Sequence, residues 1–499
     1  MMNDESGYIL ALDQGTTSSR SLVFDEEFEM VTNSQQEFKQ IYPQNGWVEH
    51  DPETIWKSQL TTAKVVLENL NQSNKKISGI GITNQRETTI VWNKTTGKPV
   101  YNAIVWQDRR THPYCDGLIN GGHNEMVQSK TGLLIDAYFS ASKVKWILDN
   151  VPGAQKSADQ NELLFGTVDT WLVWRLTNGK QHITDVSNAS RTMLFNIHTL
   201  SWDQELLKLF NIPKSMLPTV VNTCGYFGVT DKEIFGQEIP ITGIMGDQQA
   251  ALFGQMCVKK GMVKSTYGTG CFLMLNTGNS IINSTHKMLS TIGWKINEEI
   301  SYALEGSVFI GGAVIQWLRD EMEFFVEASH SEDLAEAAND NGGIYFVPAL
   351  TGLGAPYWDA NATGAIFGIT RSTSKSHLTR AALESICYQV NDVIQAMNHD
   401  VDFEISELRV DGGAAANSLL VQFQADVSNI SVVKPSQLET TALGVAFMAS
   451  IGLGKNSIKS LQKSWALDQT YHPNLDRDTT KNMLNKWSEA VKRSLNWPS

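Results

Sequence analysis

Two short segments of the chain combine glycine and hydroxyl residues in a pattern suited to binding phosphate. The segment DQGTT (13–17) follows an uninterrupted apolar run, and YGTG (267–270) precedes another. Glycine leaves backbone N–H groups accessible, threonine hydroxyls can donate to phosphate oxygens, and a carboxylate such as Asp13 can hold Mg²⁺. Each turn alone fits an ordinary capped strand end equally well. Together they predict two facing hairpins that clamp one polyphosphate.

Two other strand ends carry charged residues that could act on a polyol. Arg86 and Glu87 follow the apolar strand 77–82, and a surface ion pair is the default interpretation of such neighbours. Alternatively, they hydrogen-bond vicinal hydroxyls, with Arg86 also accommodating the developing phosphate. Asp247 stands between the apolar strand 241–245 and a helix, where an aspartate usually caps the helix. Aimed into a cleft, it could instead be the general base for a substrate hydroxyl.

A third strand end, VDGGAAAN (410–417), is composed almost entirely of small residues. Such a surface lets a flat ligand such as adenine lie against the backbone. The alternative is a glycine-rich turn selected for close packing, with Asn417 as a helix N-cap, and it is at least as well supported locally. The chain contains neither a G-x-x-x-x-G-K-[ST] loop nor H-R-D with D-F-G. It must therefore bind ATP, if it does so, through another architecture.

The elements that would position these residues follow an α/β pattern. Strands are predicted at 8–12, 21–24, 77–83 and 89–92, with helices at 142–150 and 170–176. The region around 265–276 repeats the opening strand–turn–strand, which indicates two related halves around a cleft. Apolar periodicity predicts helices over 378–397 and 312–325, and Gln316 lies off the apolar face of the second. The polar segment 455–499 is predicted to be a helical appendage.

Composition limits the classes of function. The 499 residues suggest two large domains or three of about 150 residues. The net charge of −13 argues against a nucleic-acid polymer as partner. No apolar run approaches the ~18 residues of a membrane span, and residues 1–6 are polar, unlike a signal peptide, so we expect a cytoplasmic protein without membrane insertion. Five scattered cysteines without zinc-ligand spacing indicate free buried thiols.

Taken together, the motifs resemble those of the FGGY carbohydrate kinases. The resemblance runs from Tyr8 to about Leu453, and its combination and order are far more specific than any single piece. The matching segments are LDQGTTSSR (12–20), TNQRET (83–88), IVWQDRR (104–110), GDQQAALFGQ (246–255), YGTGCF (267–272), EGSVFIGGAVIQWLRD (305–320), PYWD (356–359), VDGGAAAN (410–417) and the two signature stretches 138–150 and 364–384.

This resemblance implies an α/β fold of two duplicated actin-like, ribonuclease-H-like ATPase domains. We expect residues 1–253 to form the first domain and 254–499 the second, with an interdomain catalytic cleft. It also implies transfer of the γ-phosphoryl group of ATP to glycerol, giving sn-glycerol 3-phosphate, with Mg²⁺ as cofactor. Relatives form dimers and tetramers, so we expect a homodimer or homotetramer.

The resemblance also assigns roles by position. Asp247 matches the catalytic base, and Asp13 matches the carboxylate near Mg²⁺. The glycerol contacts correspond to Arg86, Glu87, Trp106, Tyr138, Asp247, Gln248 and Phe272. The nucleotide contacts correspond to Thr16, Thr17, Ser18, Arg20, Thr269, Gly312, Gln316, Gly413 and Asn417.

The chain departs from the family in the segment 225–240. Some bacterial members have a loop here that binds fructose 1,6-bisphosphate, and others have a phosphorylatable histidine, where this chain has Glu233. We therefore expect neither form of control. Two alternative functions remain open on sequence grounds. One is an FGGY kinase for a pentulose or a polyol such as erythritol, and the other is an actin- or chaperone-like ATPase, which would not need the polyol residues.

Overall fold

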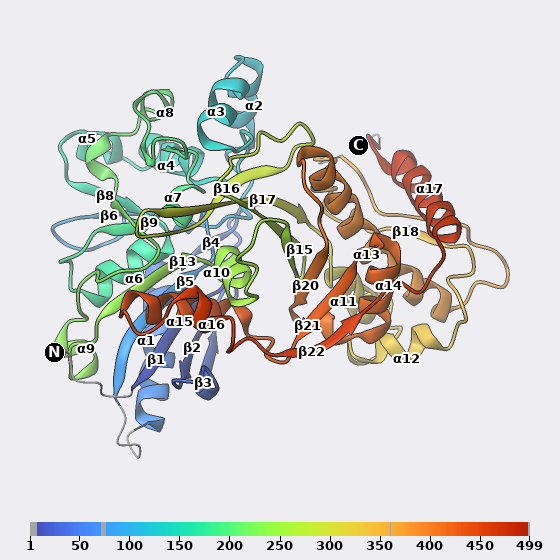
Figure 1. Ribbon diagram of the computed structural model, residues 1–499. Helices are drawn as coiled ribbons and strands as arrows, with labels where there is room; N and C mark the ends of the chain where they lie inside the picture. Colours follow the sequence, from blue (N-terminus) through green and yellow to red (C-terminus); the bar gives the residue numbers. More distant parts are fainter. Residues whose placement is uncertain (1–6, 71–75, 360, 498–499) are drawn as a thin grey trace.

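The computed structural model of the protein describes residues 7–70, 76–359 and 361–497. Figure 1 shows two halves, each built on a β-sheet covered by helices. The polar segment 1–6, on which the expectation of no signal peptide rests, lies outside the described residues. Within those residues, no helix is both long and apolar enough to cross a membrane.

The first sheet has the strand order β13-β5-β1-β2-β3. Strands β1, β2 and β3 form an antiparallel meander, whereas β5 and β13 run parallel to β1. Helix α1 packs on one face and helix α15 on the other, which explains why Leu10 and Ala11 of the N-terminal run are both fully buried. The bounds are β1 (Tyr8–Gln14), β2 (Ser18–Phe24), β3 (Met30–Glu37), β5 (Ile77–Asn84), β13 (Ile241–Gly246), α1 (Pro52–Asn69) and α15 (Thr440–Gly452).

The second sheet repeats this plan with one additional strand at each edge. Its order is β16-β17-β15-β14-β20-β21-β22, in which β14, β15 and β17 are antiparallel neighbours and β20 and β21 run parallel to β14. The predicted duplication is thus confirmed by topology. The bounds are β14 (Met262–Tyr267), β15 (Cys271–Gly278), β16 (Leu289–Ile296), β17 (Glu299–Val308), β20 (Glu407–Asp411), β21 (Ser431–Pro435) and β22 (Leu467–Tyr471).

Smaller elements complete both halves (Figure 1). The additional helices are α2 (His112–Asn120), α3 (Asn124–Thr131), α4 (Ser140–Asn150), α5 (Ala154–Asp159), α6 (Val168–Leu176), α7 (Val186–Ala189), α8 (Gln204–Leu209), α9 (Lys232–Phe235), α10 (Asp247–Gly254), α11 (Ala313–Asp320), α12 (His330–Glu336), α13 (Lys375–Asp400), α14 (Ser418–Ser428), α16 (Ile458–Leu461) and α17 (Arg477–Ser494). Short strands pair outside the two sheets: β4 (Glu49–His50) with β7 (Ala103–Ile104), β6 (Ile90–Asn93) with β8 (Leu163–Gly166), β9 (Ile183–Asp185) with β12 (Thr219–Val221), β10 (Phe195–Asn196) with β11 (Ser201–Trp202), and β18 (Tyr345–Val347) with β19 (Ala365–Phe367).

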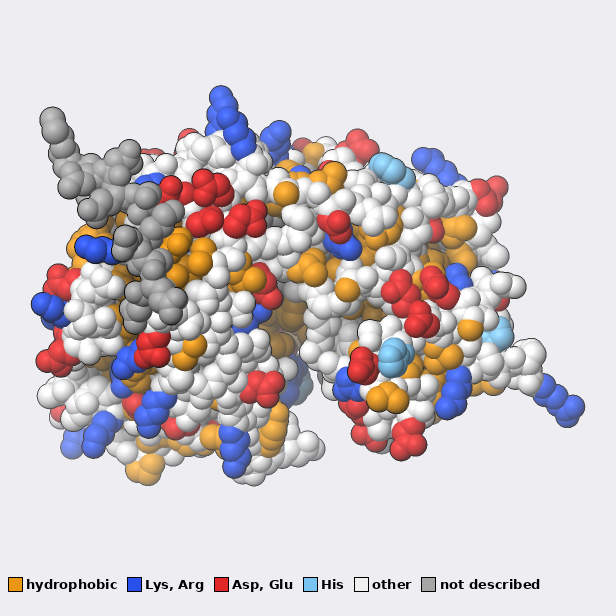
Figure 2. Space-filling view, turned by 90° about the horizontal axis from the view of Figure 1, so that it is seen from below, with side chains coloured by type: hydrophobic (Ala, Val, Ile, Leu, Met, Phe, Trp, Pro, Cys, Tyr) orange, Lys and Arg blue, Asp and Glu red, His pale blue; other side chains and the backbone are white. Residues whose placement is uncertain are grey.

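The two halves meet where helices α10 and α15 cross. Each helix follows the fifth strand of the shared sheet plan, β13 in one half and β21 in the other. A Cβ atom on Gly254 would lie 1.9 Å from the Thr440 carbonyl oxygen, and one on Gly444 would lie 1.9 Å from that of Ala250. The helix backbones therefore touch, which only glycine permits. Figure 2 shows the two lobes from below, with a deep hollow between them.

Two segments differ from the sequence-based predictions. The helix expected over 312–325 ends at Asp320. Glu323 has a φ of 52°, which no α-helix accommodates, and Met322 is 41% exposed. The C-terminal segment is not a purely helical appendage, because β22 pairs antiparallel with β21. Trp487 of α17 is 1% exposed and donates from Nε1 to Asp392 Oδ2 at 2.7 Å.

The remaining predictions about helices and thiols are confirmed. The periodic segment 378–397 lies within α13, whose N-terminus is a capping box between Ser374 and His377. All five cysteines are free and buried.

Glu233, which stands where some relatives have a phosphorylatable histidine, is exposed on the short helix α9.

Candidate active site

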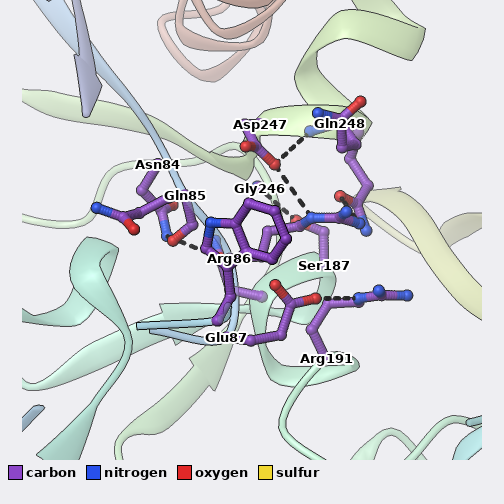
Figure 3. Close-up of polar contacts among 12 residues, drawn as sticks. Asn84, Gln85, Arg86, Glu87, Ser187, Arg191, Gly246, Asp247 and Gln248 are labelled. Carbon is purple, nitrogen blue, oxygen red and sulfur yellow. Dashed lines mark hydrogen bonds and ion pairs between the residues drawn. The ribbon is translucent and has the colours of Figure 1, made fainter. Parts of the chain in front are cut away.

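The charged residues predicted to bind a polyol come together at the ends of two neighbouring parallel strands. Asn84 of β5 pairs with Gly246 of β13, so the next residues of both strands emerge side by side. Arg86 Nε lies 3.1 Å from Asp247 Oδ1. Figure 3 draws this ion pair as a dashed line. Arg86 is 3% exposed and Glu87 is 1% exposed. The interpretation of these two residues as a surface ion pair is therefore wrong.

Asp247 does not cap the helix that it begins. The N-cap position of α10 is Gly246, and Asp247 Oδ1 accepts a hydrogen bond from the Gln248 N–H at 2.7 Å. Burial raises the pKa of Asp247 to about 6, against the opposing effect of the Arg86 charge, while Glu87 raises it further. The Asp247 side chain keeps 28% exposure. It is therefore a carboxyl with a raised pKa that still reaches open space, as a general base requires.

The three aromatic residues predicted to contact the polyol also lie together. The ring centroid of Trp106 is 5.7 Å from that of Tyr138 and 6.0 Å from that of Phe272. Trp106 and Tyr138 precede α10 in the chain, whereas Phe272 lies on β15 of the second sheet. The aromatic cluster thus brings together residues far apart in the chain, and of the three only Phe272 comes from a strand of a large sheet.

Gln248 is held by a lysine that the sequence did not single out. Lys264 of β14 donates hydrogen bonds to Gln248 Oε1 and, at 2.9 Å, to Thr266 Oγ1. The lysine is fully buried, and this burial lowers its pKa to about 8. Because Gln248 Oε1 accepts from the ammonium group, its Nε2 amide is the group free to donate elsewhere.

Both predicted hairpins form, at the turns between β1 and β2 and between β14 and β15. In the first, the Gly15 N–H donates to Ser18 O at 2.9 Å, and in the second the Gly268 N–H donates to Gly270 O at 2.9 Å. Thr17 and Thr269 are exposed at the two tips, whereas Thr16 Oγ1 accepts from Trp106 Nε1 at 2.9 Å. Ser18 is largely buried on β2, where its hydroxyl accepts from Gln35 Nε2 at 3.0 Å.

The second hairpin packs against the start of α11. Gly312, the N-cap of that helix, donates its N–H to Gly268 O at 2.8 Å. Gln316 is exposed one turn later, as its position off the apolar face predicts. The N–H groups of Gly311 and Ala313 likewise donate to Thr269 O, so the start of the helix and the hairpin are bonded into one unit.

The small-residue strand end carries both features that the sequence left as alternatives. Asn417 caps α14 by accepting the Leu420 N–H at 2.9 Å. Gly412 has a φ of 88°, and a Cβ there would lie 2.5 Å from Tyr267 O, so glycine is needed for packing. A Cβ on Gly413 would meet nothing within 4 Å. The turn is thus closely packed on one side and open at Gly413 on the other.

Asp13 lies beneath the first hairpin in contact with Arg20. Asp13 is 2% exposed, and Arg20 bridges it to Glu439 Oε2, at 2.6 Å from Nη1. No group of three or more acidic, histidine or cysteine side chains in the described part of the chain could hold a metal ion. One carboxylate still fits Mg²⁺, because this ion keeps several waters and takes its other ligands from substrate phosphates.

Comparison with known proteins identifies the family. The model of the FGGY family of carbohydrate kinases, N-terminal domain, matches residues 8–254, and that of its C-terminal domain matches residues 263–453. The chain belongs to the FGGY family of carbohydrate kinases. It is therefore a phosphotransferase that uses ATP, and the interpretation as an actin- or chaperone-like ATPase is wrong.

Individual members of this family match the chain over nearly its full length. It is 56% identical to a glycerol kinase of Parabacteroides distasonis over 497 residues, which cover 99% of this chain and 100% of that protein. It is 55% identical to glycerol kinase 2 of Thermotoga maritima, covering 98% and 99%. The crystal structure of Plasmodium falciparum glycerol kinase with ADP superposes with a TM-score of 0.93 at 36% identity, covering 99% of both chains.

Proposed function

We propose that this kinase transfers the γ-phosphoryl group of ATP to glycerol and releases sn-glycerol 3-phosphate and ADP. The observation that carries the proposal is the pairing of Arg86 with Asp247 near the aromatic cluster of Trp106, Tyr138 and Phe272, whose Tyr138 acts electrostatically on Arg86. A three-carbon polyol needs groups for its hydroxyls and a face for its C–H bonds. Full-length similarity to proteins named glycerol kinase supports the same substrate.

In the proposed mechanism, Arg86, Glu87 and Gln248 hold the hydroxyl groups and leave one of them next to Asp247. The Asp247 carboxylate accepts the proton of that hydroxyl as its oxygen bonds to the γ-phosphorus, while the bond from phosphorus to the β,γ-bridging oxygen breaks and ADP leaves. Phosphoryl transfer depends mainly on position and charge, so one base and a fixed acceptor suffice. Approach of the two halves would exclude water, which would otherwise compete as acceptor.

The nucleotide would lie between the two hairpins. Thr16, Thr17, Ser18, Arg20 and Thr269 surround its phosphates in this proposal. Gly312, Gln316, Gly413 and Asn417 lie along the second half, where the adenosine would rest on the open surface at Gly413. Asp13 is the residue proposed to hold Mg²⁺, which offsets phosphate charge when bound. Arg20 would then exchange part of its pairing with Asp13 for a phosphate oxygen.

We also propose that the chain divides into domains 1–253 and 254–499 and assembles as a homodimer or homotetramer. The two sheets and the two matched segments support the division. Sedimentation velocity of the purified protein would measure the assembly, and a monomer at micromolar concentration would contradict it.

An assay of ADP release with glycerol, dihydroxyacetone, erythritol and xylulose as acceptors tests the substrate. We expect the highest kcat/KM with glycerol, and we expect a stereospecific glycerol 3-phosphate dehydrogenase to oxidise the product. A higher kcat/KM with another acceptor would refute glycerol as the substrate. ATP hydrolysis that none of the four acceptors accelerates would refute the proposed reaction as a whole.

A further inference from the structure

A chain of five buried or partly buried charges runs behind the proposed polyol site. It begins at Asp247, passes to Arg86, then to Glu305 and Arg191, and ends at Glu87, with alternating sign throughout. Arg86 Nη1 lies 2.5 Å from Glu305 Oε2, Arg191 Nη2 lies 2.9 Å from Glu305 Oε1, and Arg191 Nε lies 2.6 Å from Glu87 Oε1. Figure 3 shows the Glu87 end of this chain, with Arg191 pointing to the carboxylate.

Glu305 is the centre of the chain. It lies on β17 of the second sheet and is fully buried. Its Oε1 accepts from both Arg86 Nη2, at 3.1 Å, and Arg191 Nη2. The charges of the two arginines overcome the effect of burial and lower the pKa of Glu305 to about 2. One carboxylate of the second half therefore fixes two guanidinium groups of the first.

The two arginines in turn fix the two carboxylates at the ends of the chain. With its Nη atoms on Glu305, Arg86 directs Nε to Asp247. Arg191 takes Glu87 Oε1, and within the described residues Glu87 Oε2 has no hydrogen-bond partner. The Arg191 guanidinium also lies 5.5 Å from the ring centroid of Tyr138. The carboxylates of Asp247 and Glu87 are thus held in a fixed orientation, and each keeps one side for a ligand.

Side chains close to Arg191 in the chain are also bonded to the ends of β5 and β13. Asn188 Oδ1 accepts from Asn84 Nδ2 at 3.1 Å, just before Arg86. Ser187 Oγ accepts the Gly246 N–H at 3.0 Å, just before Asp247. The segment that carries Arg191 is therefore bonded to both strand ends. This bonding holds the Arg191 guanidinium in a fixed position relative to the two strand ends.

We propose that Glu305 and Arg191 are positioning residues for the acceptor, holding Arg86 and Glu87 in the geometry that binds its hydroxyls. The alternative is a buried ionic group that only stabilises the fold. Burying charges costs several kcal/mol per ion before pairing, so simple stability does not explain why such a chain replaces apolar packing. The inference rests on the proposed function, because it takes the acceptor to be the polyol that the wild-type enzyme phosphorylates.

The test compares Glu305→Gln and Arg191→Lys with the wild type and with a matched control, Glu384→Gln. Glu384 is a 5% exposed glutamate on α13 whose Oε1 lies 3.2 Å from Arg380 Nε. The control therefore also removes the charge of a buried glutamate that pairs with an arginine. We expect both test variants to raise the KM for glycerol by about tenfold or more, since small misplacements cost this much. The KM for ATP should change less than about twofold in every variant, which is far less than the change expected in the KM for glycerol.

The pH profile separates positioning from a purely structural role. Charged groups that face Asp247 are Arg86, Glu87 and Lys264. Removing the Glu305 charge leaves the positive field of Arg86 less compensated, so the pKa of Asp247 falls. The acid limb of kcat/KM should move to lower pH in Glu305→Gln. It should stay in place in Arg191→Lys, which keeps its charge.

The outcomes distinguish the two proposals. A wild type inactive on glycerol refutes the proposed function. An active wild type, with variants that lose thermal stability but keep the wild-type KM for glycerol and the wild-type acid limb, refutes the inference. If Glu305→Gln does not fold, Arg191→Lys alone decides. An unchanged KM for glycerol in a folded Arg191→Lys protein then overturns the proposal.

Discussion

The raised pKa of Asp247 predicts a pH dependence that distinguishes a partly buried base from an ordinary carboxylate. With a pKa of about 6, Asp247 is about 90% ionised at pH 7 and about 10% ionised at pH 5. If it is the base, kcat/KM for glycerol should fall roughly tenfold between these two pH values. An aspartate at its ordinary value of 3.8 would remain more than about 90% ionised at pH 5, giving an almost flat profile.

The physical reason lies in the surroundings of the carboxyl group. Burial at the start of α10 favours the neutral acid and is the largest effect, whereas the neighbouring Arg86 favours the carboxylate. Glu87 opposes ionisation and Lys264 favours it. Burial prevails, so the acid form persists to a higher pH than in the unfolded chain.

The assay is ADP release with glycerol varied at saturating ATP between pH 5 and 8, with the coupling enzymes doubled at each pH as a control. The variant Asp247→Asn should lose about 10²- to 10⁴-fold in kcat, the usual worth of a general base, while still binding glycerol. A flat profile from pH 5 to 7 would refute the effect of burial. Near-normal turnover of the asparagine variant would refute the role of Asp247 as base.

Three further predictions test other parts of the structure. Gly444→Ala should destabilise the protein by about 1–3 kcal/mol or more in urea unfolding, because its Cβ would lie 1.9 Å from Ala250 O. The control Gly117→Ala, where a Cβ meets nothing within 4 Å, should not lower the stability. Equal urea midpoints for the two variants would contradict the tight crossing of α10 and α15. Burial raises the pKa of Asp169 to about 7, so the folded state keeps a proton that the unfolded chain releases near 3.8, and stability should decline as pH rises between these values. Asp169→Asn cannot ionise and should show a smaller loss of melting temperature from pH 5 to 7, whereas parallel curves would contradict this. A thiol reagent should modify none of the five cysteines in the native protein and all five in denaturant, and rapid native labelling would show that a thiol is accessible.

The hairpins and strand ends were predictable because their signals are local. An apolar run followed by glycine and threonine specifies a strand and its turn, and both hairpins form where the sequence places them. The end of α11 was not predictable, because apolar periodicity continues to Phe325 while the backbone turns at Glu323. Strand β22 is not predictable for a related reason: its residues 467–469 are exposed, and the segment is a strand only because β21 offers an unpaired edge.

The site shows the same division between local and distant signals. Arg86 and Glu87 are adjacent in sequence and oppositely charged, so sequence reasoning naturally pairs them with each other. In the folded protein each takes a partner far along the chain, Asp247 and Glu305 for Arg86 and Arg191 for Glu87. Glu305 is the first residue of the segment 305–320, but nothing in its local sequence indicates that it contacts two arginines of the other half.

These pairings explain how a chain with a net charge of −13 can bind a polyanionic nucleotide. Net charge describes the surface, whereas the described cleft residues carry nearly balanced charge. The basic residues are Arg20, Arg86, Arg191 and Lys264, and the acidic residues are Asp13, Glu87, Asp247 and Glu305. The ion pairs among them neutralise these charges without a ligand. In the proposed nucleotide complex, we therefore expect hairpin N–H groups, hydroxyls and a cation on Asp13 to hold the phosphates more than free positive charge does. Since Arg20 is already shared between Asp13 and Glu439, nucleotide binding should weaken the contact between these two segments and so affect how the halves meet.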